Sequence, residues 1–259
     1  MSAPRDIILS ITVPSTGDGV TDLQAFKRCW NALHAKNPAV LRETRCVLCI
    51  SLRPCFLKEA ITAEIEASWL ADDIPIHHVC DTSWGQCFND AFLFAVSCDR
   101  AKYWLHVDEE HVCSRPFWNS AAAVLKGPGA HLWQLQITED WDDLPEDRLL
   151  ERDGFTQVLP HPDEKAQKAL NPDKYVDDEP YLSLWPVFSL RPSVFLLEHF
   201  RTATTRGLSL RPFDEVADWA PLQWRFGLKL EGLGAKKGLL TPTAFRQAES
   251  SEMEGDFPN

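Results

Sequence analysis

Three consecutive carboxylates, Asp108, Glu109 and Glu110, have the side chains in this sequence best suited to chemistry. They directly follow an apolar run, Tyr103–Val107. Acids beside an apolar core repel one another, so a positive group is expected to neutralise them. Carboxylate oxygens are ligands that suit Mg²⁺ or Mn²⁺. We therefore expect Asp108 and Glu110 to bind one of these cations; the alternative is an acidic turn in contact with water.

The run Tyr103–Val107 predicts a buried strand that ends at the acids. His106, within this apolar strand, is expected to be a hydrogen-bonded core residue rather than a metal ligand. Ser114 and Pro116 follow and predict the start of a helix. Open α/β sheets bind ligands at the carboxyl ends of their strands, so the acids lie where a site is expected.

Strand and helix patterns alternate along roughly the first 125 residues. Apolar runs predict strands and four-residue spacings predict helices; in chain order these are 6–14, 21–37, 45–52, 57–69, 74–79 and 85–97. Repeated strand–helix–strand units favour a parallel, doubly wound sheet. The sequence therefore predicts an α/β protein whose fourth strand ends at the acids.

The second half of the chain is less regular. Residues 131–138 predict a strand, and Arg191-Pro192-Ser193 predicts the start of a helix that continues to about residue 202. Segments 139–153 and 159–180, rich in acids or in proline, are expected to be long loops. The polar, acidic segment 246–259 is expected to be a disordered tail.

Composition excludes some classes of function. The formal net charge of −12 argues against sequence-independent binding of nucleic acid, which needs a basic face. No run has the length of a membrane span, and residues 1–6 lack a signal-peptide pattern. The eight cysteines fall mostly in predicted strands and helices and are expected to be reduced thiols. We therefore expect a cytoplasmic protein.

The order of these elements resembles the GT-A fold of nucleotide-sugar glycosyltransferases, especially their inverting family-two group. Four short segments are similar to motifs of that group. They are Val13-Pro14-Ser15-Thr16, Gly85-Gln-Cys-Phe-Asn89, Asp108-Glu109-Glu110 and Asp218-Trp-Ala-Pro-Leu-Gln-Trp-Arg225-Phe-Gly227. The resemblance implies one Rossmann-like α/β domain with a mainly parallel central sheet flanked by helices. Within it, residues 1–125 would bind the nucleotide sugar and residues 126–245 the acceptor.

The resemblance also implies roles for particular residues. Asp108 would contact the ribose or the metal, Glu110 would bind the metal directly, and His111 is a reserve ligand. Asp218 would remove the proton of the acceptor hydroxyl as the general base. Arg225 would pair with phosphate, and Arg191 could serve the same purpose. The donor site would comprise Pro14, Ser15, Thr16, Gly85, Asn89, Asp108 and Arg225.

Two departures from the family pattern concern the donor and the metal. Ser51-Leu52-Arg53 stands where family members usually carry an aspartate that contacts the nucleotide, so the base stays open, although a UDP-sugar is the expected donor. The region after Gly227 lacks the late histidine that many GT-A enzymes use as a metal ligand. His161 or His199 could substitute for it.

The expected acceptor is a glycan, a protein, a small molecule or a modified nucleobase in DNA. The last of these needs a basic groove, and basic residues do concentrate in the final third of the chain. They are Arg191, Arg201, Arg206, Arg211, Arg225, Lys229, Lys236 and Lys237. Two other functions stay open: a non-catalytic nucleotide-sugar-binding module, and a nucleotidyltransferase. The second is disfavoured because Ser15–Gly19 contains no Lys or Arg.

Overall fold

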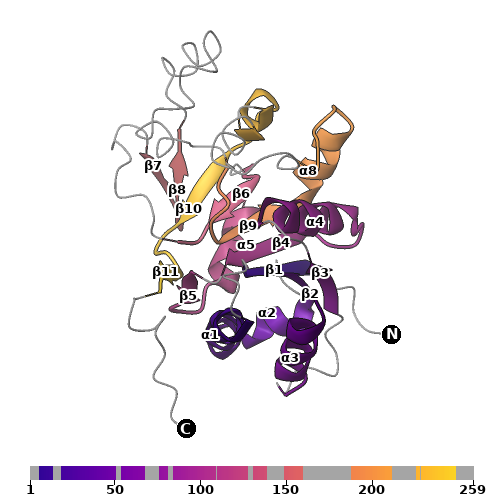
Figure 1. Ribbon diagram of the computed structural model, residues 1–259. Helices are drawn as coiled ribbons and strands as arrows, with labels where there is room; N and C mark the ends of the chain where they lie inside the picture. Colours follow the sequence, from indigo (N-terminus) through magenta and orange to yellow (C-terminus); the bar gives the residue numbers. More distant parts are fainter. Residues whose placement is uncertain are drawn as a thin grey trace, which may run out of the picture.

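The computed structural model describes most of the chain, from Asp6 to Ala248. The described residues are 6–13, 19–50, 54–67, 76–80, 84–108, 110–127, 131–138, 149–159, 188–211, 226–227 and 229–248. They form a nine-stranded sheet in the order β3-β2-β1-β4-β9-β6-β10-β8-β7 and a separate two-stranded sheet, β11-β5. Helices cover both faces of the large sheet (Figure 1). This is the α/β arrangement that the sequence predicts.

The first half of the chain forms the parallel part of the sheet. Strands β2, β1 and β4 pair in parallel, and β3 extends the sheet beside β2. The elements are β1 (Ile7–Val13), α1 (Gly19–Lys36), α2 (Pro38–Glu43), β2 (Thr44–Ile50), α3 (Pro54–Ala67), β3 (Ile76–Cys80), α4 (Trp84–Ser97) and β4 (Tyr103–Asp108). The predicted alternation is confirmed, and only α2 was not expected. Pro38 ends α1 but also occupies the first turn of α2, where a proline needs no N–H partner.

The second half adds strands of both directions. Its elements are β5 (His111–Cys113), α5 (Trp118–Lys126), β6 (Gln134–Gln136), β7 (Leu149–Arg152), β8 (Phe155–Val158), β9 (Ser193–Leu196), α8 (Leu197–Thr204), β10 (Lys237–Leu240) and β11 (Phe245–Gln247). Strand β9 lies antiparallel between β4 and β6, and β8 is antiparallel to β10 and β7. The other strands share one direction, so the sheet is mainly parallel. No described helix is long and apolar enough to span a lipid bilayer.

Three local predictions in this half are wrong. Ser193–Leu196 is a strand, and the helix begins only at Leu197, because Val194 and Phe195 are fully buried on opposite faces between β4 and β6. Ser114 does not cap a helix: its hydroxyl donates to the Ala244 carbonyl, and α5 begins later. Part of the segment 139–153 that was expected to be a loop belongs to the β7–β8 hairpin.

The sequence analysis places the start of the disordered tail too early, at residue 246. Residues 246 and 247 belong to β11, which pairs with β5, and the Ala248 N–H donates to the Glu110 carbonyl at 2.7 Å. Residues 249–259 lie outside the described residues. The end of the described chain is therefore part of the structure around the acids.

Two hydrophobic cores lie on the two faces of the sheet. One contains Ile7, Leu9 and Ile11 of β1 and packs against α1, α2, α3 and α5. The other contains Ile8 and Trp104 and packs against α4 and α8. Figure 1 shows α1–α3 on one side of the sheet and α4 with α8 on the other. Because side chains alternate along a strand, β1 and β4 contribute to both cores.

Candidate functional site

The acids lie at the carboxyl end of the central strand β4. The helices α1 and α4 begin at this same end of the parallel strands, and we call this end of the sheet the acid edge. Asp108 is the last residue of β4, and its carboxylate folds back onto the turn that follows. Its Oδ1 accepts the Glu110 N–H at 3.1 Å and lies 2.5 Å from His111 Nδ1. Asp108 and His111 are largely buried, whereas Glu110 is exposed. The turn thus fixes Asp108 and presents Glu110 to solvent.

Two distant segments hold this turn in place. Gln247 of β11 pairs with His111 of β5, next to the bond between the Ala248 N–H and the Glu110 carbonyl. On the other side, the Cys29 thiol of α1 lies 3.7 Å from the Asp108 carbonyl oxygen. The backbone of the acid turn is therefore anchored by β11, and α1 contacts it.

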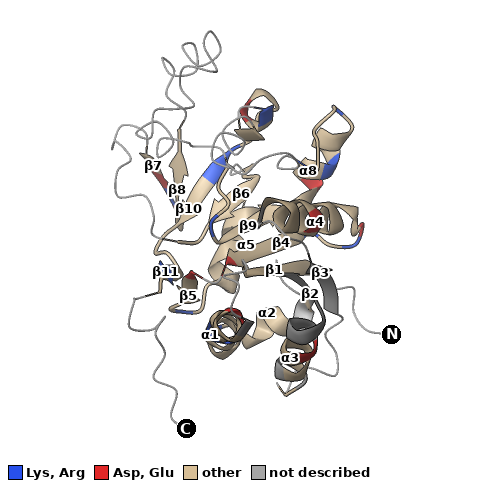
Figure 2. Ribbon diagram, in the orientation of Figure 1, with Lys and Arg blue, Asp and Glu red and all other residues tan. Residues whose placement is uncertain are grey.

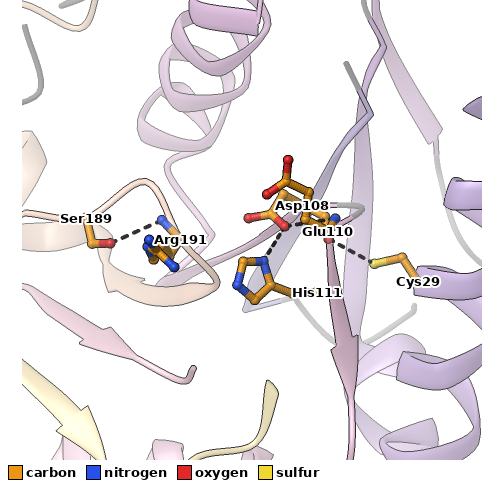
Figure 3. Close-up of polar contacts among 6 residues, drawn as sticks. All are labelled: Cys29, Asp108, Glu110, His111, Ser189 and Arg191. Carbon is orange, nitrogen blue, oxygen red and sulfur yellow. Dashed lines mark hydrogen bonds and ion pairs between the residues drawn. The ribbon is translucent and has the colours of Figure 1, made fainter. Parts of the chain in front are cut away.

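Arg191 faces the acids from the loop before β9. Figure 3 shows its side chain across from Asp108, Glu110 and His111. Desolvation lowers the pKa of the Arg191 guanidinium, while the charges of Asp108 and Glu110 raise it. The Arg191 guanidinium therefore lies within electrostatic range of both carboxylates. Sequence analysis named Arg191 only as a second choice for phosphate.

The loop that presents Arg191 is held by a buried glutamine of β6. Gln134 Nε2 donates to the Ser189 carbonyl at 2.6 Å and to Ser193 Oγ at 2.7 Å. Gln134 Oε1 accepts the Ser189 N–H at 2.9 Å. The Arg191 N–H donates to Ser189 Oγ at 3.2 Å. Such a network fixes the backbone at both ends of the loop, so Arg191 extends from a rigid support.

His106 is a core residue, as the sequence predicts. Its Nδ1 lies 3.0 Å from Ser10 Oγ, which also accepts the Trp104 Nε1–H at 2.8 Å. Burial lowers the pKa of His106 to about 4, although Asp108 and a hydrogen bond with the Leu190 backbone raise it. The imidazole is therefore neutral at physiological pH. Its hydrogen bond with the Leu190 backbone connects β4 to the loop that carries Arg191.

Of the other predicted site residues, the structure describes Gly85, Asn89 and His199. Gly85 and Asn89 lie in the first turns of α4, which follows β3 and so begins at the acid edge; Asn89 is fully buried. Pro14, Ser15, Thr16, Asp218, Arg225 and His161 lie outside the described residues. His199 cannot substitute as a metal ligand near Asp108. It belongs to α8, which follows Leu196, and Leu196 pairs with Tyr103 at the opposite end of β4.

The described basic residues do not form a groove for nucleic acid. Arg201 donates to the Val96, Cys98 and Ala101 carbonyls, at and just beyond the C-terminal end of α4. Arg211 pairs with Asp90, and Lys237 is buried, with its pKa lowered well below the usual value by desolvation. Figure 2 shows Lys and Arg on separate elements rather than gathered in one patch. The expectation of a basic groove is not supported within this part of the chain.

The oxygen ligands at the acid edge fit a cation that is also held by its substrate. Asp108 Oδ1 makes two contacts within the turn, so the oxygens left for a cation are Asp108 Oδ2 and those of the exposed Glu110 carboxylate. Among the described residues no group of three or more His, Cys, Asp or Glu side chains is arranged for a metal. Mg²⁺ is often held by one or two carboxylates together with substrate phosphates, and the residues fit that kind of site.

Comparisons with known proteins identify the fold. No protein-family model and no curated protein sequence matches the chain. Its structure is similar to S. aureus TarS (1–349), with a TM-score of 0.54 and 9% identity over 95% of this chain and 61% of that chain. TarS in complex with UDP-GlcNAc matches with a TM-score of 0.50 and 10% identity over 97% of this chain and 61% of that chain.

A second similar structure is the mannosyltransferase PcManGT from Pyrobaculum calidifontis in complex with GDP-Man and Mn²⁺. It matches with a TM-score of 0.50 and 14% identity over 95% of this chain and 56% of that chain. This chain therefore spans about six tenths of the length of these structures. At such low identity the likeness concerns the fold alone: the chain has a nucleotide-sugar glycosyltransferase fold.

Proposed function

We propose that this protein is a glycosyltransferase that moves a sugar from a nucleotide-sugar donor to an acceptor hydroxyl. One observation supports this most: in a nucleotide-sugar glycosyltransferase fold, β4 ends at Asp108, Glu110 lies in the turn that follows, and Arg191 faces both carboxylates (Figure 3). A sugar nucleotide has a diphosphate leaving group, whose developing negative charge needs cations or fixed donors. In this proposal the two carboxylates supply a site for the cation, and Arg191 supplies a fixed donor.

In this proposal Asp108 and Glu110 hold Mn²⁺ or Mg²⁺. When bound, the cation would stabilise the charge of the departing diphosphate as a Lewis acid. Arg191 adds a guanidinium, which suits phosphate oxygens, from a loop that is already rigid. A pre-positioned charge of this kind needs little reorganisation during the reaction, so it favours the transition state.

The remaining roles are proposed from the family resemblance. Asp218 is the general base that deprotonates the acceptor hydroxyl, with inversion at the anomeric carbon. Pro14, Ser15, Thr16, Gly85, Asn89 and Arg225 contact the nucleotide or its phosphates. We propose a UDP-sugar as donor, because TarS is similar to this chain and has been solved with UDP and with UDP-GlcNAc.

Thermal denaturation with a ligand panel tests this proposal. The ligands are UDP, GDP, UDP-GlcNAc and GDP-mannose, each with Mn²⁺, Mg²⁺ or EDTA. A ligand at about 100 times its Kd stabilises the native state by about 2.7 kcal/mol, which raises Tm by several degrees. We expect a metal-dependent rise with one nucleotide class. Absence of any shift across the panel would contradict the proposal.

Three variants separate metal binding from catalysis. Glu110→Ala should abolish the metal-dependent part of the shift, whereas Glu151→Ala, which removes an exposed acid from the β7–β8 hairpin, should retain it. Asp218→Asn should bind donor normally but lower kcat by about 10²- to 10⁴-fold, the usual contribution of a general base. If the wild type binds donor without transfer or hydrolysis, the protein is instead a non-catalytic nucleotide-sugar-binding module.

A further inference from the structure

A row of polar side chains crosses the buried α4 face of the sheet near the acid edge. Ser10 of β1 pairs in register with His106 of β4, His106 with Ser193 of β9, and Ser193 with Gln136 of β6. All of these residues are 0% exposed. Buried polar groups are normally hydrogen-bonded, so each member of the row needs a partner.

Gln136 is the exception in this row. Ser10 and His106 bond to each other, and Ser193 Oγ accepts from Gln134. In contrast, both Nε2 and Oε1 of Gln136 are buried without a hydrogen bond in the described part of the chain. An apolar side chain of the same shape would be less costly to bury there. The amide therefore needs an explanation other than stability.

Gln136 lies at the same end of the sheet as the acids. Strand β6 runs parallel to β4, because β9 is antiparallel to both, so Gln136 lies at the acid edge. The next residue, Ile137, donates its N–H to the Pro192 carbonyl, beside Arg191. Thr12 of β1 pairs in register with Asp108 of β4. Its buried side-chain hydroxyl also has no hydrogen bond among the described residues. Both unsatisfied side chains thus lie along one edge, on either side of β4.

A carboxamide offers N–H donors and a carbonyl acceptor side by side. This pair matches two neighbouring hydroxyls, or a hydroxyl and an acetamido group, on a sugar ring. A site that hydrogen-bonds such groups discriminates strongly against sugars that lack them, since its own polar atoms are then left unpaired. The chemistry therefore favours a hydroxylated ring over an apolar or ionic group.

We infer that Gln136 hydrogen-bonds the sugar of the donor and determines which sugar is transferred. This inference rests on the proposed function and deepens it. Because the amide is fully buried, contact requires a side-chain movement at the acid edge when the donor binds. On this inference, changing Gln136 should alter recognition of the sugar ring and leave binding of the nucleotide unchanged.

Gln134→Met is the matched control for Gln136→Met, because the two glutamines lie two residues apart on the same face of β6. Without ligand, Gln136→Met should keep or raise Tm, since it removes an unsatisfied amide. Gln134→Met should lower Tm by several degrees, because it removes bonds to Ser189 and Ser193. An equal fall in both variants would show that Gln136 is structural and would overturn the inference. Gln136→Leu repeats the test with a second apolar side chain.

Binding and turnover complete the experiment. For Gln136→Met we expect the Kd of the nucleoside diphosphate to stay within about twofold of wild type, while kcat/KM for the preferred sugar nucleotide falls by about 10- to 100-fold and the preference between sugars narrows. Unchanged sugar preference would overturn the inference while the proposed function stands. If the wild type binds no nucleotide at all, the proposed function fails, and this inference fails with it.

Discussion

The two faces of β1 and β4 differ in what they bury. On the face covered by α1, α2, α3 and α5, every β1 and β4 residue of the core is hydrophobic, from Ile7 to Val107. On the face covered by α4 and α8, aromatic rings such as Trp104 and Phe92 pack at one end, and polar side chains lie at the acid edge. Burial of polar groups costs free energy unless they are bonded, so the second face is less optimised for stability.

This difference indicates that the functional residues lie on the face covered by α4 and α8. The polar positions of the α4 face are neighbours in register across four strands, although they are far apart in sequence. Ser10 and His106 bond to each other, Ser193 bonds to Gln134 in the network that fixes the Arg191 loop, and the Gln136 amide is left for a ligand. A face that served only stability would be expected to resemble the apolar one.

The largest expected effect of a substitution on stability comes from the apolar face. Leu105 is fully buried there, three residues before Asp108. Leu105→Ala should lower the free energy of unfolding by about 3 kcal/mol, because it leaves a cavity and removes buried methyl groups. Urea denaturation measures this, and Leu105→Met, which conserves volume, should cost less than about 1.5 kcal/mol. A small loss in Leu105→Ala would show that this face is loosely packed.

The polar face should instead make stability depend on pH. The pKa of His106 is about 4 in the folded protein, below its value of 6.5 in a model peptide. Stability from the neutral ring is fully present above pH 6.5 and is lost as pH falls toward 4, by about 3 kcal/mol in total. Denaturation at a series of pH values measures the loss. NMR titration should show no protonation of His106 above pH 5; titration near pH 6.5 would contradict the prediction.

The smallest effect is expected for a polar contact outside both cores. Arg211 and Asp90 form an ion pair at 2.9 Å with side chains 51% and 31% exposed. Solvent screens such a pair, so Asp90→Asn should change the free energy of unfolding by less than about 1 kcal/mol. A loss above about 2 kcal/mol would mean that this exposed pair matters as much as the buried bonds. Salt dependence of the loss provides the control.

Much of the first half of this protein could be predicted from local pattern. The apolar runs of β1 and β4, the helical spacing of α4 and the acids at the end of β4 follow from side-chain periodicity, which is a local property. The elements of the second half were harder. Ser193–Leu196 follows Arg191-Pro192, which favours a helix start, yet pairing with β4 and β6 on both sides favours a strand.

The candidate site divides in the same way. Sequence analysis identified Asp108, Glu110 and His111, which are neighbours along the chain. It did not identify Gln134 and Gln136, although two polar residues that alternate with Leu135 and Ile137 in a buried strand were an available signal. It also offered His199 as a possible substitute for the late histidine ligand, which the antiparallel direction of β9 excludes.

The sequence by itself determined the periodic elements, the acidic strand end and the absence of a basic surplus, because each depends on residue type and near spacing. Tertiary structure alone decided that Arg191 faces those acids, that β11 anchors the acid turn, and that Gln136 lies at the same edge. These relations depend on strand order and register, which are set by packing between segments distant along the chain.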